Sequence, residues 1–151
     1  MHMKSEKINV INSTGNWPLP ERKIIDIMMF VVGILGIEGE TDLLLTDDKL
    51  MRKYNKKYRS IDSSTDVLSF SVPEDDFVLS EEKIFGNIVI SWEQLTNDAE
   101  EIGVNIDKMM ARLIIHALLH LSGYDHLEVH EKMLMQKEEA RLLSLYKLHQ
   151  L

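Results

Sequence analysis

The chain has 151 residues, a length that fits a single domain spanning residues 1–151. Hydrophobic residues make up 44% and charged residues 28% of it, as in ordinary globular proteins. No apolar run approaches the ~20 residues of a membrane-spanning helix, and the N-terminal residues lack the layout of a secretory signal. We therefore expect a cytoplasmic protein without a membrane partner. The chain contains no cysteine, which leaves His, Asp and Glu as ligands for any metal site.

Charge is distributed unevenly along the chain. The formal net charge is −8, which by itself argues against a nucleic-acid partner. Between Lys49 and Arg59, however, there are six basic residues and no acidic one. The sequence therefore predicts an acidic protein with one basic segment that is able to face a polyanion.

The first part of the chain alternates predicted strands with predicted helices. Residues 7–11 alternate polar and β-branched side chains, which favours a strand. Apolar residues at helical spacing predict a helix over residues 20–35. Residues 41–45 favour a second strand, and Asp47 or Asp48 is expected to cap the basic helix that follows.

The remainder of the chain continues this alternation. Strands are expected at residues 66–71 and 86–91, and helices at residues 92–101, 108–121 and 128–148. Helices that alternate with short, largely apolar strands are typical of an α/β protein. We predict an α/β/α sandwich with a mixed sheet of roughly four strands and about five helices.

A group of three histidines predicts a metal site. His116 and His120 are four residues apart, so on a helix they lie on one face and are able to converge on one ion. Gly123 permits the left-handed conformation that ends a helix, which allows His126 to return to the same ion. Three protein ligands leave one position for water, as in catalytic zinc sites. We expect one zinc ion per chain, although three imidazoles also suit nickel or another divalent metal.

Other interpretations of the histidines compete with this one. A lone histidine on an apolar face is usually a hydrogen-bonded core residue, and His130 is a rival ligand with a solvated helix position as its simpler role. The spacing also matches the metalloprotease pattern His-Glu-x-x-His-x-x-Gly-x-x-His. Ala117, however, occupies the position of the glutamate that serves those enzymes as general base, which argues against a protease.

Three blocks of sequence carry a family resemblance. Residues 116–126 match the pattern His-Gly-x-Leu-His-Leu-x-Gly-Tyr-Asp-His, with Ala117 in place of its glycine. Residues 86–91 match Gly-Asp-Ile-x-Ile-Ser, with Asn87 in place of its aspartate. A further block comprises Asn55, Tyr58, Arg59, Asp62 and residues 65–70. On these blocks the chain resembles the YbeY family of bacterial endoribonucleases, also called rRNA maturation factors.

This resemblance implies a fold, an activity and partners. Such a protein is a zinc-dependent, single-strand-specific endoribonuclease that acts in 3′-end maturation of small-subunit ribosomal RNA and in ribosome quality control. The implied partners are single-stranded RNA, ribosomal RNA and the ribosome or its small subunit, and no DNA is expected. By resemblance His116, His120 and His126 are the metal ligands, and Arg59 is the functionally important arginine of the cleft.

The basic segment also has a physical interpretation. Arginine offers a planar set of donors that suits phosphate oxygens, so Arg59 is a candidate catalytic and substrate-binding residue. Lys53, Lys56 and Lys57 are candidate contacts to an RNA backbone, with a solvated basic helix face as the alternative. Two other functions remain open. One is a metal-stabilised ribosome-assembly or RNA-binding factor without strong nuclease activity. The other is a metalloprotease-like hydrolase, against which Ala117 argues.

Overall fold

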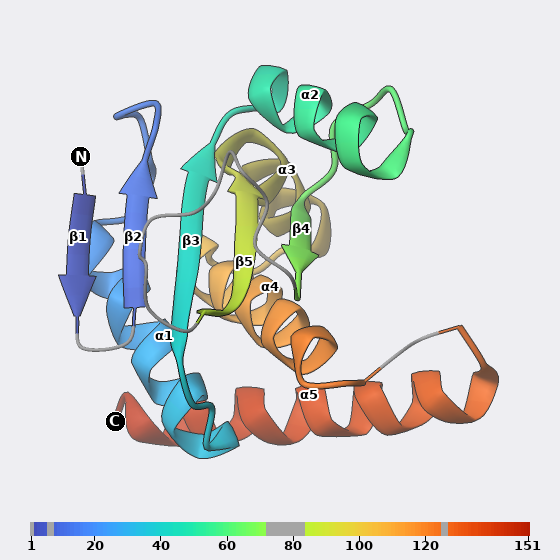
Figure 1. Ribbon diagram of the computed structural model, residues 1–151. Helices are drawn as coiled ribbons and strands as arrows, with labels where there is room; N and C mark the ends of the chain where they lie inside the picture. Colours follow the sequence, from blue (N-terminus) through green and yellow to red (C-terminus); the bar gives the residue numbers. More distant parts are fainter. Residues whose placement is uncertain (1, 6–7, 72–83, 125–126) are drawn as a thin grey trace.

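A five-stranded sheet with helices on both faces forms the framework of the protein (Figure 1). The computed structural model describes residues 2–5, 8–71, 84–124 and 127–151. In chain order its elements are β1 (His2–Ser5), β2 (Ile8–Asn12), α1 (Glu21–Leu35), β3 (Glu40–Thr46), α2 (Asp48–Arg59), β4 (Val67–Phe70), β5 (Ile84–Ser91), α3 (Trp92–Ile102), α4 (Ile106–Leu121) and α5 (Val129–His149). Each predicted element has a counterpart whose ends differ by no more than two residues.

The sheet is mixed, with the strand order β1-β2-β3-β5-β4. Strands β2, β3 and β5 are parallel, whereas β1 and β4 pair antiparallel with β2 and β5. The predicted α/β class with a mixed sheet and five helices is confirmed. The additional strand is β1, whose sequence His-Met-Lys-Ser shows no alternating apolar pattern. This strand is recognisable only through its main-chain pairing with β2.

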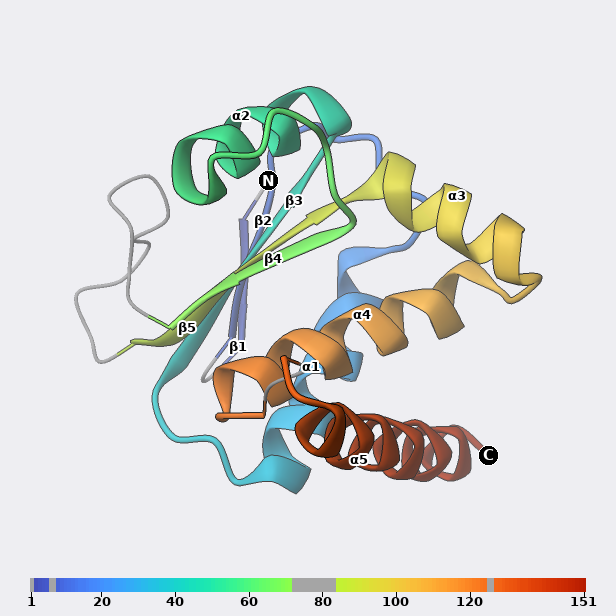
Figure 2. The same ribbon diagram turned by 90° about the vertical axis from the view of Figure 1, so that its right-hand side faces the viewer.

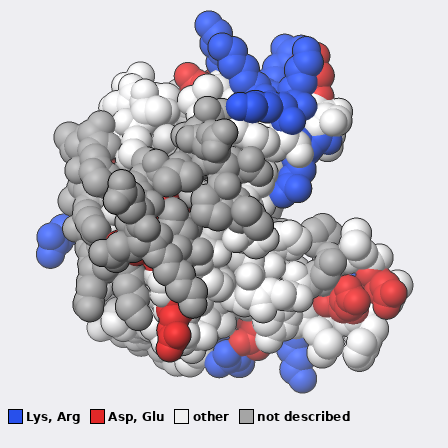
Figure 3. Space-filling view, in the orientation of Figure 1, with Lys and Arg blue, Asp and Glu red and all other residues white. Residues whose placement is uncertain are grey.

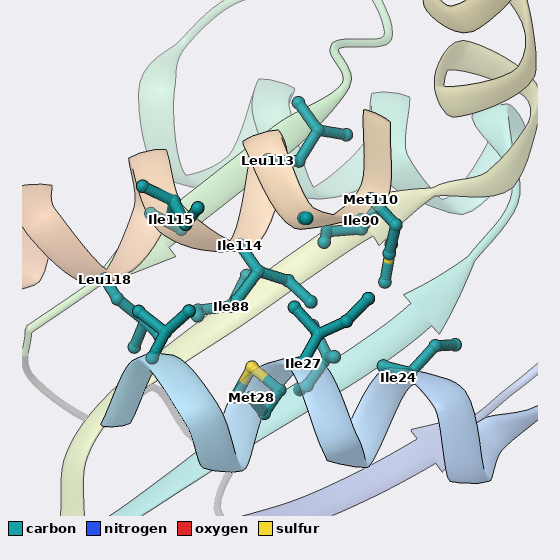
Figure 4. Packing of buried hydrophobic residues seen from close by; sticks show 14 of the residues in the cluster. Ile24, Ile27, Met28, Ile88, Ile90, Met110, Leu113, Ile114, Ile115 and Leu118 are labelled. Carbon is teal, nitrogen blue, oxygen red and sulfur yellow. The ribbon is translucent and has the colours of Figure 1, made fainter. Parts of the chain in front are cut away.

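The larger core lies on the face of the sheet that α1, α3, α4 and α5 cover (Figure 2). Helix α1 follows Pro20 and ends at Gly36, whose φ of 64° is the left-handed conformation that stops a helix. Its buried side chains meet those of α4 and β5 between the two layers (Figure 4). Fully buried members of this core include Ile24, Ile27, Met28, Leu43, Leu45, Ile88, Ile90, Met110 and Ile114.

Helix α2 lies on the opposite face, over a smaller core. This core consists of Met51, Leu68, Phe70 and Val89. Asp47 caps the helix by accepting a hydrogen bond from the backbone N–H of Leu50 at 2.9 Å, which confirms one of the two predicted caps. The carboxylate of Asp48 instead accepts bonds from the hydroxyls of Ser64 and Ser91, both at 2.7 Å. Asp48 thereby ties the start of α2 to the loop that precedes β4 and to the end of β5.

The fold places β4 at the edge of the sheet, between α2 on one face and α4 on the other. The C-terminal end of α2 and the cationic residues that it carries therefore approach β4 from one side. The face of α4 that carries the histidines approaches β4 from the other. In the part of the chain that the structure describes, no helix combines the length and the apolar character needed to cross a membrane.

Candidate functional site

His116 and His120 lie on one face of α4, where both side chains are partly exposed. The three residues between them, Ala117, Leu118 and Leu119, are buried in the main core. The helix is therefore anchored through its apolar face. The two imidazoles lie outside this face, where they are partly exposed. The Nδ1 atom of His120 is buried. This placement agrees with the predicted i, i+4 arrangement of two metal ligands.

The end of α4 turns the chain back on itself. The backbone N–H of Tyr124 donates to the carbonyl of Leu119, and that of Gly123 donates to the carbonyl of His120, both at 3.1 Å. This pair of bonds is a Schellman motif, and it requires a positive φ at its central residue. Gly123 supplies that conformation with a φ of 106°, as its sequence position predicted.

The third predicted ligand, His126, lies outside the described residues. Its role as a ligand therefore stays a prediction. His130, the rival candidate, is exposed near the start of α5. Among the residues that are described, no group of three or more His, Asp or Glu side chains is placed to hold an ion. The described part of the site thus consists of His116 and His120, whose nitrogen donors suit zinc and nickel alike.

A carboxylate from α5 orients His116. The Nδ1 atom of His116 lies 3.3 Å from Oε1 of Glu139. Hydrogen bonding to Glu139, strengthened by the charges of Glu139 and Asp66, raises the pKa of His116 against the opposing effect of burial. With its proton on Nδ1 the ring donates to Glu139 and leaves the lone pair of Nε2 for a metal ion. Partners of this kind typically accompany histidines that bind metals.

Two further carboxyl groups lie beside this histidine. Asp66 precedes β4 and accepts a hydrogen bond from the backbone N–H of Val67 at 2.8 Å. Asp98 of α3 is hydrogen-bonded to Asp66, and burial together with this bond raises the pKa of Asp98 to about 6. Asp98 is therefore protonated at mildly acidic pH and donates this hydrogen bond to Asp66.

A cavity of about 540 Å³ brings these groups together. It lies between the start of β4 and helices α3, α4 and α5. Its polar walls are formed by Asp66, Asp98, Arg112, His116, Glu139 and Lys147. A cavity of this size with a few convergent polar groups is typical of a ligand-binding site.

Arg59 approaches β4 from the end of α2. Its Nη2 atom donates to the carbonyl of Ser69 at 2.9 Å, and its Cζ atom lies 4.9 Å from the centre of the Phe70 ring. These contacts hold an exposed guanidinium at the edge of the sheet. Asp66 and Ser69 are three residues apart, which corresponds to about 10 Å along a strand. Arg59 therefore lies beside one part of the edge strand β4. The cavity that contains His116 lies beside the neighbouring part of the same strand.

The remaining cations of α2 form a basic surface (Figure 3). The side chains of Lys53, Lys56 and Lys57 are exposed, as a role in binding phosphates requires. Arg52 is paired with Asp62 at 2.7 Å, so part of its charge is compensated. The ammonium of Lys57 lies 5.0 Å from the centre of the Tyr58 ring. The predicted substrate-binding lysines thus share the helix that ends at Arg59.

A family model described as Endoribonuclease YbeY matches residues 16–147. The chain belongs to this family. A YbeY endoribonuclease of Caldicellulosiruptor saccharolyticus is 40% identical over 112 residues, which cover 69% of this chain and 71% of that one. One of Listeria innocua is 32% identical and covers 93% of this chain and 95% of its own. A Treponema denticola relative of the same name is 43% identical over 110 residues, which cover 72% of this chain and 71% of that one.

The fold has a counterpart among solved structures. The solution structure of a Thermotoga maritima protein superposes with a TM-score of 0.62, covering 91% of this chain and 85% of its own, at 21% sequence identity. At this level of identity the likeness supports the fold alone. A protein whose structure has been determined experimentally therefore shares this arrangement of strands and helices.

The chain departs from the YbeY sequence patterns at two positions, and both are buried. Ala117 is only 1% exposed and contributes its methyl group to the main core, which explains why alanine is accepted in α4. Asn87 in β5 is also 1% exposed, and within the described residues its side-chain oxygen and nitrogen make no hydrogen bond. Asn87 pairs in register with Asp42 of β3, which Asn9 already bridges to the buried Glu40, so a neutral amide here avoids adding a further carboxylate.

Glu139, Asp66 and Asp98 were not predicted as site residues. Asp66 belongs to a sequence block that the YbeY resemblance covers, whereas Glu139 and Asp98 carry no local signal. Glu139 is 23 residues from His116 in a helix rich in glutamate, so its sequence position does not distinguish it from its neighbours. Only the packing of α5 against α4 selects this carboxylate.

Proposed function

We propose that this protein is a cytoplasmic, zinc-dependent, single-strand-specific endoribonuclease. We further propose that it acts in 3′-end maturation of small-subunit ribosomal RNA and in ribosome quality control. The observation that carries the metal-dependent activity is the pair His116 and His120 on α4, with Glu139 bound to His116 at 3.3 Å. Membership of a family named for endoribonuclease activity supports RNA as the substrate.

His116, His120 and His126 would hold the zinc ion, or nickel in its place. A bound ion of this kind supplies Lewis acidity and activates water for attack on a phosphodiester. Glu139 is placed to accept the proton of Nδ1 of His116, which would leave Nε2 to bind the ion. Asp98, with a pKa of about 6, is able to exchange a proton near neutral pH in the same cavity.

Arg59 would act on the phosphate. Its guanidinium carries five N–H donors, of which the described hydrogen bond to Ser69 uses one. The remaining donors are suited to the phosphoryl oxygens, on which negative charge grows during cleavage. The contact with Phe70 restricts the guanidinium, so less side-chain freedom is lost when RNA binds.

Helix α2 would guide the rest of the RNA strand. Lys53, Lys56 and Lys57 are exposed on the helix that ends at Arg59. Lysine contacts of this kind bind phosphates without reading sequence, and they release counterions on binding. Binding should therefore weaken as salt is added.

Metal analysis joined to an RNA cleavage assay tests this proposal. The wild-type protein should retain about one zinc or nickel ion, as expected for a site with three protein ligands and one open position. It should cut single-stranded but not double-stranded RNA. His116→Ala should lose the ion and the cleavage together. His130→Ala, which removes an exposed histidine of α5, should keep both. RNA binding without cleavage by the fully metal-loaded wild type would instead identify an assembly or RNA-binding factor.

A further inference from the structure

Two pairs of side chains face each other between α4 and α5. His116 meets Glu139 at 3.3 Å, and Lys108 and Lys147 are close enough for their like charges to lower the pKa of Lys108. In each helix the two paired residues are eight positions apart, and α5 runs opposite to α4 (Figures 1 and 2). Eight residues of helix correspond to about 12 Å. The groove between the helices thus has a histidine end and a lysine end separated by roughly this distance.

Three cations gather at the lysine end. The like charges of Lys147 and Arg112 lower the pKa of Lys108. Arg112 and Lys147 are exposed, and Lys108 is partly exposed. Within the described residues none of the three forms an ion pair with Asp or Glu, whereas Arg52 and Arg141 each do. Cations that repel one another at close range favour the binding of an anion between them.

Two of the three cations line the same cavity as His116 of the candidate metal site. Arg112 and Lys147 line this cavity together with His116 and Glu139. Along α4, residues Lys108, Arg112, His116 and His120 recur at intervals of four, so they form one row on the helix. The carboxylate of Glu139 lies 3.3 Å from His116, and that of Asp66 lines the same cavity. Acidic groups therefore lie at the histidine end of the groove, and basic groups lie toward its lysine end.

We propose that Lys108, Arg112 and Lys147 form a phosphate-binding subsite for single-stranded RNA whose reacting phosphodiester lies at the histidines. This subsite rests on the proposed ribonuclease function and extends it. It is separate from the basic surface of α2, which approaches β4 from the other face of the sheet. An RNA strand bound at both places crosses the histidine region between two sets of cations. The subsite contacts backbone phosphate and carries no base specificity.

Binding of RNA in the presence of EDTA tests the subsite independently of cleavage. The probe is a fluorescent single-stranded oligouridine about 12 nucleotides long, followed by anisotropy between about 50 and 200 mM salt. Combined Arg112→Gln and Lys147→Gln substitutions should weaken binding about 10-fold and reduce the salt slope by about 1.4, or ~0.7 for each lost contact. Lys147→Arg should retain wild-type affinity, because the charge is kept.

A charge-matched control removes two exposed cations elsewhere, Arg22 of α1 and Lys132 of α5, by substitution with Gln. This control should leave the salt slope unchanged. The subsite is wrong if the cluster variant binds RNA like the wild type, or if the control loses as much affinity. It is also wrong if inorganic phosphate displaces the RNA as well as unlabelled RNA does, since the cluster then binds free anions.

The ribonuclease proposal and the subsite fail in distinguishable ways. A metal-loaded wild type that cuts no RNA refutes the ribonuclease function, while the binding data in EDTA still decide the subsite. Conversely, a cluster variant that folds, cuts RNA and binds it normally refutes the subsite alone. Folding is checked by thermal unfolding, in which neutralising mutually repelling cations should not lower the midpoint.

Discussion

The histidine region of α4 and the basic surface of α2 obtain their chemistry in opposite ways. All the cations of α2 come from one stretch of the chain between Lys49 and Arg59. His116 of α4, in contrast, interacts with Glu139 from α5 and with Asp66, which precedes β4. The first region is built by local sequence, and the second is assembled from distant segments by the fold.

This difference predicts different responses to substitution. The exposed lysines of α2 act as separate point charges, so their loss should reduce RNA binding in small steps. The groups around His116 touch one another, so the loss of one changes the others. Arg59 is the exception within α2, because Ser69 and Phe70 of β4 hold its guanidinium at the edge strand. Three experiments test which residues act as separate charges and which act through their contacts with other residues.

The largest effect is expected for Arg59→Ala. Losing a preorganised donor to a phosphate on which charge develops should reduce cleavage of single-stranded RNA about 100-fold or more. Metal content should be unchanged, because Arg59 approaches β4 from the side of α2 and contacts Ser69 and Phe70. Single-turnover kinetics and elemental analysis measure the two quantities. Lys53→Ala is the matched control, with an expected loss far smaller than that of Arg59→Ala; equal losses would remove the distinction between Arg59 and the lysines.

A smaller effect is expected for Glu139→Ala. Removing the carboxylate from Nδ1 of His116 leaves the ring without its orienting partner, so metal affinity should fall about 10- to 100-fold. Competition with a chelator measures the affinity without reference to activity. Glu139→Gln should recover part of it, because the amide oxygen still accepts a hydrogen bond. Glu100→Ala, an exposed change on α3, should have no effect. Unaltered affinity in Glu139→Ala would show that α5 contributes packing alone.

The smallest effect is expected for Asp98→Asn, measured as stability in EDTA. The pKa of Asp98 rises from 3.8 to about 6 on folding, so the ionised group destabilises the folded protein as pH increases through this range. The amide cannot ionise and still donates to Asp66. Its free energy of unfolding should therefore exceed that of the wild type by about 1 kcal/mol above pH ~7, after allowance for solvent screening.

Urea unfolding at several pH values measures this difference. The advantage of the variant should shrink as pH falls and disappear below pH ~3, where Asp98 is protonated in both the folded and the unfolded protein. A constant difference at every pH would contradict the assigned pKa. A less stable variant at neutral pH would show that the carboxyl group, in its charged form, supports the fold.

Much of the fold was predictable because its signals are local. The helical spacing of apolar residues located α1, α3 and α4 to within two residues, and a composition rich in Leu, Met, Glu and Lys located α5 equally well. The cap at Asp47 and the reversal at Gly123 were also predicted, since each depends on hydrogen bonds to residues only a few positions away. Strand β1 was missed because its four residues lack an apolar alternation and are ordered by pairing with β2.

The site divides in the same way between local and distant contributions. The sequence by itself determined the basic character of α2 and the common face of His116 and His120, because helical periodicity relates residues four apart whatever surrounds them. Only the tertiary structure decided that Glu139 meets His116 and that Lys147 lines one cavity with Arg112. Both contacts follow from the antiparallel packing of α5 on α4. Packing depends on the shapes of whole helices and on the path of the chain between them, and no short motif in either helix encodes it.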